Sequence, residues 1–194
     1  AQYADMPVIN ALTDDEHPCQ ILADFMTLQE CFGTLAGLTL TYLGDGNNVA
    51  HSLLLGAAIA GINIRIATPP EFAPQPRIVD WAVHLAAGRC EIAITDDAKA
   101  AVEGAQAVYT DVWASMGQEN LASQRIPIFQ PYQVNQELMA LASPEAILLH
   151  CLPAHRGEEI TDEMIEGAQS QVWNQAENRM HAQKALLASL LGIQ

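Results

Sequence analysis

The sequence has 194 residues, half of them hydrophobic, so it can bury the core of one large domain or of one domain with added helices. Its formal net charge is -15, with only 8 Lys and Arg residues, which argues against nucleic acid and against an anionic membrane as partners. The 4 cysteines are far apart and form no Cys-x-x-Cys pair, which indicates a reducing compartment with neither a zinc site nor a disulfide framework. We therefore expect a protein of the cytoplasm, with the mitochondrial matrix as the alternative, and no metal.

The longest weakly polar run extends from Leu53 to Ile62, which is shorter than the roughly 20 residues needed to cross a bilayer. It is rich in Gly and Ala, and we interpret it as a buried helix. Residues 1–5 show neither the basic nor the apolar region of a signal peptide. We expect no membrane partner.

The first expected helix runs from about Pro18 to Cys31 and stops at Gly33. His17 and Gln20 share one face at its start, where backbone N–H groups favour an anion or a carbonyl oxygen. A histidine at a helix start is more often a cap or a surface residue, so the residues alone leave its role open.

Beyond this helix, short apolar segments alternate with helical ones. The expected strands cover residues 38–43, 62–67, 91–95, 107–110 and 146–150. The expected helices cover residues 49–60, 77–87, 96–104, 119–124, 134–141, 161–166 and 177–191, with Gly61 and Gly88 as stops of the first two. Residues 126–130 and 171–173 are expected to be extended. This alternation predicts an α/β fold with a doubly wound, mainly parallel, Rossmann-like sheet and helices on both faces.

Polar residues follow the expected strand 107–110, in the segment Asp-Val-Trp-Ala-Ser-Met-Gly that begins at Asp111. Ligands collect at the carboxyl ends of the strands of an open parallel sheet, so Asp111 should face a crevice, where its carboxylate suits an amine. Ser115, Met116 and Gly117 would form a loop that closes over this crevice. The alternative is that Asp111 only caps the following segment.

The expected strand 146–150 leads to Cys151-Leu152-Pro153, which should reach the same edge of the sheet as Asp111 if the strands are parallel. A cysteine at a strand end is usually an inert small hydrophobic residue, and this alternative stays open on the residues alone.

The turn Gly44-Asp-Gly-Asn-Asn48 between a strand and a helix raises the alternative of a dinucleotide-binding fold. Three features argue against it. No third glycine follows, two amides occupy the turn, and the next strand ends in Thr-Pro-Pro without an acid for a ribose. Asn48 at a helix start is also compatible with a plain N-cap.

Five motifs occur in one order, namely His17-Pro-Cys-Gln20, Gly44-Asp-Gly-Asn-Asn48, Asp111-Val-Trp-Ala-Ser-Met-Gly117, His150-Cys-Leu-Pro153 and Glu177-Asn-Arg179. Together they resemble the ornithine carbamoyltransferases, and the likeness extends from about Pro7 to the C-terminus. The resemblance implies transfer of a carbamoyl group from carbamoyl phosphate to the δ-amine of L-ornithine, which gives citrulline and phosphate. It implies no cofactor and a homotrimer for the full-length enzyme.

The resemblance also assigns roles to individual residues. The residues that match those touching carbamoyl phosphate are His17, Gln20, Cys151, Leu152 and Arg179. The residues that match those touching ornithine are Asn48, Asp111, Ser115 and Met116. Among them, the expected catalytic residues are Cys151, His17 and Arg179, with Cys151 as a proton acceptor.

The Ser-Thr-Arg-Thr segment that holds the phosphate in this family does not occur in the 194 residues. We therefore expect residues 1–15 to be a linker from an N-terminal domain, and residues 34–175 to be the ornithine-binding domain. Residues 16–33 and 176–194 would be interdomain helices, each with an exposed apolar stripe. We expect this polypeptide alone to be inactive and to self-associate.

Three alternatives remain at this point. A related carbamoyltransferase could act on acetylornithine or putrescine, although the Ser-Met-Gly loop favours ornithine. A fragment of a nicotinamide-dependent oxidoreductase and a non-catalytic amino-acid-binding module are the others.

Overall fold

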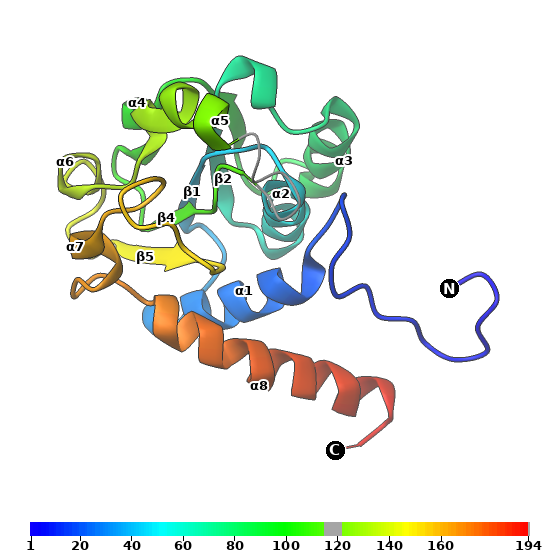
Figure 1. Cartoon of the computed structure of the whole chain (residues 1–194). Coiled ribbons are helices and arrows are strands. Elements are labelled where there is room, and N and C mark those ends of the chain that lie inside the picture. The colour runs from blue at the N-terminus through cyan, green and yellow to red at the C-terminus, as the bar shows by residue number, and fades with distance from the viewer. Residues whose placement is uncertain (115–121, 194) are drawn as a thin grey trace.

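A computed structural model describes residues 1–114 and 122–193 of the chain. Its centre is a five-stranded sheet in the order β3-β2-β1-β4-β5, in which every neighbouring pair is parallel (Figure 1). The strands are β1 (Thr39–Leu43), β2 (Asn63–Ala67), β3 (Ile92–Thr95), β4 (Ala107–Thr110) and β5 (Ile147–His150). The predicted α/β fold with a parallel sheet is confirmed.

Helices surround the sheet. The α-helices are α1 (Pro18–Phe32), α2 (Asn48–Ala60), α3 (Pro76–Ala86), α4 (Ala98–Val102), α5 (Ala122–Phe129), α6 (Gln136–Met139), α7 (Asp162–Ile165) and α8 (Val172–Leu190). Two short 3-10 helices are η1 (Pro70–Phe72) and η3 (Gln130–Tyr132). Among the described helices, none has the length and apolar character that crossing a bilayer requires.

Alternate residues of β1, β4 and β5 pack into two separate cores, because successive side chains of a strand point to opposite faces. Tyr42 and Tyr109 pack into the core covered by α1, α2 and α3. Leu43 and Val108 pack into the core covered mainly by α4, α5, α6 and α7. Among the five strands, β4 and β5 are buried at every position, which fits their mostly apolar sequences, whereas β3 at the edge of the sheet is partly exposed.

The order of the strands creates a switch point between β1 and β4. The chain moves from β1 outward to β3, and then crosses to the other side of β1 to form β4. In the register of the sheet, Leu43 pairs with Thr110, and Thr110 pairs with His150. The residues that follow these three positions therefore emerge at one edge, where open α/β sheets bind ligands.

The ends of the first two helices follow the prediction. Pro18 opens α1, and Gly33, in the left-handed region with φ 73°, donates its N–H to the carbonyl of Gln29. Gly61 ends α2 in the same way with φ 75°. For α3 the prediction was one residue late, because Ala87 takes the left-handed cap position with φ 46° and Gly88 follows it.

Residues 126–130 were predicted to be extended, which was wrong. They belong to α5 and to the start of η3, although Pro127 lies inside the helix. The side chain of Phe129 is fully buried, with Phe72 at 4.8 Å and Trp113 at 6.0 Å between ring centroids. This tertiary packing overrides the strand propensity of Ile-Pro-Ile-Phe. The predicted helix 119–124 lies partly outside the described residues.

The prediction of an extended segment at 171–173 was also wrong, and α8 begins at Val172 rather than at Glu177. Extended pairing occurs slightly earlier, where the N–H of Leu148 donates to Gln169 and the N–H of Gln171 donates to Leu148. Val172 is already buried in the second core. The β-branched and aromatic residues of Val-Trp explain the misplaced boundary.

The two terminal elements lie on one side of the molecule. Helices α1 and α8 pack side by side below the sheet, and residues 1–17 run without a helix or strand (Figure 1). Leu22 on α1 and Met180 and Leu187 on α8 are exposed. Both helices therefore present apolar side chains to solvent.

Candidate functional site

The turn after β1 holds the first side of the site. Asn47, rather than Asn48, is the N-cap of α2, and its Oδ1 accepts from the backbone N–H groups of Val49 at 3.0 Å and Ala50 at 3.2 Å. This orientation leaves Nδ2 to donate to Asp111 Oδ2 at 2.8 Å. The sequence pattern assigned no role to Asn47, although its capping signal was visible.

Gly46 has no room for a side chain. A Cβ at this position would overlap the backbone of Phe72–Pro74, so the turn after β1 is pressed against the segment that follows η1. The second glycine of Gly-x-Gly is thus required by close backbone packing, not by a dinucleotide.

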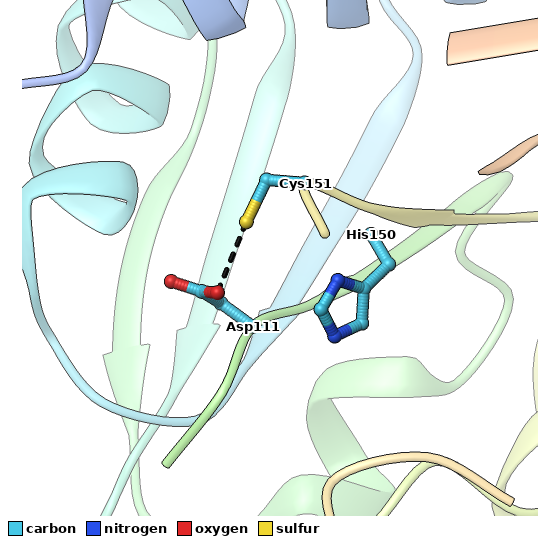
Figure 2. A group of neighbouring side chains, drawn as sticks. All are labelled: Asp111, His150 and Cys151. Carbon is cyan, nitrogen blue, oxygen red and sulfur yellow. Dashed lines mark hydrogen bonds between the residues drawn. The ribbon is translucent and has the colours of Figure 1, made fainter. Parts of the chain in front are cut away.

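Asp111 occupies the centre of the site, directly after β4, and is only 6% exposed. Besides the bond from Asn47, its Oδ1 accepts from the backbone N–H of Val112 at 2.8 Å and from the thiol of Cys151 at 3.0 Å (Figure 2). An ionised carboxylate offers about four acceptor positions. Three are used here, which leaves Oδ2 with capacity for one more donor.

The thiol of Cys151 points at the carboxylate of Asp111, as Figure 2 shows. Burial raises the pKa of this thiol well above its usual value, and the negative charge of Asp111 raises it further. The thiol therefore stays protonated at neutral pH and acts as a hydrogen-bond donor. In this arrangement it is not poised to accept a proton.

A buried pair fixes the turn that follows β5. The Nδ1 atom of His150 accepts from the N–H of Leu152 at 2.8 Å, so Nε2 carries the ring proton and donates to Glu159 Oε1 at 3.0 Å. Glu159 is 0% exposed and also accepts from the N–H of His155 at 2.6 Å. Leu152 is held in the left-handed region with φ 57°. Sequence reasoning missed Glu159, because a glutamate nine positions after His150 matches no local pattern.

His17 lies before α1 and faces the site from the opposite side. Its Nδ1 donates to the carbonyl of Ala11 at 2.9 Å, and its backbone N–H donates to Ser52 Oγ at 2.7 Å. Burial lowers the pKa of His17, and the positive charge of Arg179 lowers it further. The ring is therefore neutral at pH 7, and Nε2 carries a lone pair.

These groups surround a cavity of about 480 Å³. Five of the predicted site residues line it, namely His17, Asn48, Asp111, Cys151 and Leu152. Residues 12–14 close one side, and Asn48 Nδ2 ties them down by donating to the carbonyl of Thr13 at 2.8 Å. The structure therefore brings together an acid, a thiol and the asparagine turn from three different loops.

Gln20 and Arg179 do not line this cavity among the described residues. Gln20 is 1% exposed and lies between α1 and α8, where its Oε1 accepts from Arg179 Nη1 at 2.5 Å. Ser115 and Met116, which the sequence assigns to the same site, lie outside the described residues.

Asp111, His150 and Cys151 bring potential metal-ligand atoms within 4.8 Å of one another. Both ring nitrogens of His150 are already engaged, and the thiol is protonated against the acid. A metal ion would have to break these bonds, so the donor set fits hydrogen bonding to a ligand better than metal coordination.

Two protein-family models match the chain. Residues 36–190 match the family described as "Aspartate/ornithine carbamoyltransferase, Asp/Orn binding domain". Residues 1–30 match the one described as "Aspartate/ornithine carbamoyltransferase, carbamoyl-P binding domain". The first match includes the turn after β1, Asp111 and the turn after β5.

Curated proteins with high sequence identity to this chain are ornithine carbamoyltransferases. The chain is 66% identical over 192 residues to an ornithine carbamoyltransferase of Trichormus variabilis, which covers 99% of this chain and 63% of that protein. It is 69% identical over 191 residues to one of Thermosynechococcus vestitus, which covers 98% of this chain and 62% of that protein. The chain thus spans about 63% of the length of the curated relatives it matches.

Solved structures of ornithine carbamoyltransferases superpose closely on this chain. The ornithine carbamoyltransferase of Gloeobacter violaceus matches with a TM-score of 0.91 and 54% identity over 97% of this chain and 64% of that one. The enzyme of Pyrococcus furiosus matches with a TM-score of 0.93 and 50% identity over 96% of this chain and 60% of that one.

Proposed function

Because this chain belongs to the aspartate/ornithine carbamoyltransferase family, we propose that it is the ornithine-binding part of an ornithine carbamoyltransferase. The reaction moves the carbamoyl group of carbamoyl phosphate to the δ-amine of L-ornithine and gives citrulline and phosphate. The observation that carries this proposal is the buried carboxylate of Asp111, with acceptor capacity left beside the thiol of Cys151. The oxidoreductase alternative has no support among these relatives.

Asp111 binds the α-ammonium group of ornithine in this proposal. Its three protein donors hold the carboxylate in one orientation, and its remaining position accepts from the cation. Acetylornithine has no charged α-amino group, so the same contact disfavours it. Asn48 Nδ2 carries a second proton beyond the one given to Thr13, and this proton suits the ornithine carboxylate. Ser115 and Met116 would hold the rest of the substrate.

The δ-amine must be neutral before it attacks, since an alkyl ammonium has a pKa near ~10.4 and no lone pair. Its nitrogen forms a bond to the carbonyl carbon, the bond from that carbon to the phosphate oxygen breaks, and the departing phosphate takes up the proton that the nitrogen loses. A protonated Cys151 is not the acceptor of that proton in the free site. We assign to Cys151 the placement of the amine, and expect orientation and carbonyl polarisation to supply most of the rate.

The carbamoyl group is held from the side of α1. Nε2 of neutral His17 accepts from the carbamoyl NH2, and the backbone of Leu152 faces the same group. Arg179 is near enough to His17 for its charge to lower the pKa of that ring, and in this proposal its guanidinium, held by Gln20, polarises the carbonyl oxygen once substrate is bound.

The domain arrangement is also a proposal. Residues 1–15 act as a linker, 16–33 and the C-terminal helix connect two domains, and 34–175 bind ornithine, with α8 starting before residue 176. The carbamoyl-phosphate domain supplies the phosphate site, and the full-length enzyme is a cytoplasmic homotrimer. The exposed apolar residues of α1 and α8 support this arrangement.

Calorimetric titration of the 194-residue chain with L-ornithine, NAD and carbamoyl phosphate tests the substrate assignment. We expect heat from ornithine and none from NAD. Binding of NAD without ornithine would overturn the proposal. Acetylornithine and putrescine are the matched controls, because each lacks one charged group of ornithine.

A citrulline assay tests the domain assignment. We expect no turnover by the chain alone, and turnover when a carbamoyl-phosphate domain with its Ser-Thr-Arg-Thr segment is supplied. Rapid turnover by the chain alone would contradict the division between the two domains.

A further inference from the structure

A cluster of polar side chains lies where α1, α8 and β4 meet. We call it the Asp24 cluster, and its members are Gln20, Asp24, Tyr109, Gln175 and Arg179. Asp24 is 0% exposed, as are Tyr109 and Gln175. Asp24 matches no motif that the sequence singled out, and the proposed chemistry does not use it.

A single oxygen of Asp24 orients two amides. Its Oδ1 accepts from Gln20 Nε2 at 2.8 Å and from Gln175 Nε2 at 2.7 Å. A carboxylate oxygen accepts from an amide NH2 and repels an amide oxygen, so both amides must turn their oxygens away from Asp24.

The amide oxygens of Gln20 and Gln175 accept hydrogen bonds from two parts of the candidate site. Gln20 Oε1 accepts from Arg179 Nη1 at 2.5 Å. Gln175 Oε1 accepts from the backbone N–H of His150 at 2.9 Å, one residue before the thiol. Through these two amides, Asp24 sets the position of the guanidinium and of the strand end that carries Cys151.

This arrangement costs stability. Burial raises the pKa of Asp24 from 3.8 to about 7, although the bonds from the two amides oppose the shift. Its Oδ2 has no hydrogen-bond partner among the described residues. The titratable or charged groups that face it are Arg179 on α8, Tyr109 on β4 and Cys151 after β5. A buried acid that destabilises the fold needs a reason other than stability.

We propose that Asp24 is a positioning residue for carbamoyl transfer, which holds Gln20 with Arg179 and Gln175 with the end of β5 in the orientation that the reaction needs. Asp24 touches no substrate. This inference rests on the proposed function, because it assigns the guanidinium of Arg179 to the carbamoyl group.

The test compares Asp24→Asn with Asp24→Leu in the full-length enzyme. Asn keeps an acceptor oxygen for both amides, whereas Leu keeps only the volume. We expect Asp24→Asn to retain kcat within about threefold and Asp24→Leu to lose about 100-fold in kcat. The KM for ornithine should stay within about threefold in both, since Asp111 is untouched.

Two results would overturn this inference. A folded Asp24→Leu enzyme with kcat near that of the wild type would show that the orientation is not needed. An equal loss of kcat and of ornithine affinity would show that Asp24 only maintains the fold. If the unchanged full-length enzyme makes no citrulline, the proposed function itself has failed, which is a separate outcome.

A second variant decides the matter if Asp24→Leu does not fold. Gln175→Met removes the arm that reaches His150, together with its bonds to Asp24 and Tyr109, and leaves Gln20 bonded to Asp24. We expect kcat to fall about tenfold with ornithine affinity unchanged. A kcat within about twofold of the wild type would contradict the proposal.

Discussion

Two buried acids in this molecule are built differently. Asp111, at the end of β4, accepts three hydrogen bonds from nearby donors and borders an open cavity. Asp24, inside α1, has one oxygen that serves two amides and another without a partner among the described residues. The first has acceptor capacity left for a cation in the cavity, whereas burial raises the pKa of the second from 3.8 to about 7.

This contrast shows where each acid can act. A carboxylate at a strand end can contact a ligand, because the switch point opens a crevice there. A carboxylate between two helices can only act on a ligand through other side chains. The following predictions test this distinction, in order of decreasing effect.

Asp24 makes stability depend on pH. The unfolded chain releases this proton near pH 3.8 and the folded chain near pH 7, so its contribution to stability is present below 3.8 and is lost as the pH rises through 7. The loss is on the order of 4 kcal/mol. We expect Asp24→Asn to be more stable than the wild type at pH 8 and similar to it at pH 4. Denaturant unfolding of both proteins at several pH values checks this.

An equal pH dependence of the wild type and of Asp24→Asn would show that Asp24 titrates normally. Asp80→Asn, on the outer face of α3, is the control for removing one negative charge.

Asp111→Asn should abolish the charge that meets the α-ammonium group. We expect ornithine affinity to fall about 100-fold, because charge-assisted hydrogen bonds in a buried site are the strong ones. Calorimetric titration measures the change. Asp14 also lines the cavity but is exposed, so Asp14→Asn is the matched control and should change affinity less than about threefold. Similar losses in the two variants would remove the special role of Asp111.

The reactivity of Cys151 should report the charge of Asp111. Burial and the neighbouring carboxylate raise the pKa of this thiol, so alkylation should be slow at pH 8. In Asp111→Asn the pKa should fall, and alkylation should be about tenfold faster. Mass spectrometry follows the modification, with exposed Cys31 as the internal reference. An unchanged alkylation rate would show that the charge of Asp111 has no effect on the reactivity of Cys151.

Asn47 combines capping of α2 with support of Asp111, and two substitutions separate these tasks. Serine can still cap the helix but offers no amide to Asp111, so Asn47→Ser should keep its stability within about 0.5 kcal/mol. Its ornithine affinity should fall about fivefold. Asn47→Ala should also lose about 1 kcal/mol of stability. Equal affinity in all three proteins would show that the bond to Asp111 Oδ2 has no effect on binding.

Periodicity and turn signals predicted the parts of the fold that depend on local chemistry. Pro18 and Gly33 marked the ends of α1, and the alternation of strands and helices predicted the parallel sheet. The two extended segments at 126–130 and 171–173 were wrong, because burial of Phe129 and Val172 decides their conformation. Contacts of this kind join distant parts of the chain and leave no local pattern.

In the candidate site, too, contacts between distant parts of the chain could not be predicted from local patterns. The strand-end rule placed Asp111 and Cys151 at one edge, where the structure has them. The partners that orient this edge were not predicted, since Asn47 reaches Asp111 across the fold and Glu159 bonds His150, the residue before Cys151. Asp24 was missed for a related reason, because an acid in the middle of a helix usually indicates a solvated face.

The sharpest test of the proposed ornithine site is a crystal structure of the chain with L-ornithine. We predict that the α-ammonium nitrogen lies about 3 Å from the Asp111 carboxylate, with the δ-amine toward Cys151. Ornithine bound elsewhere, or bound in the cavity with Asp111 contacting only its protein donors, would contradict this assignment.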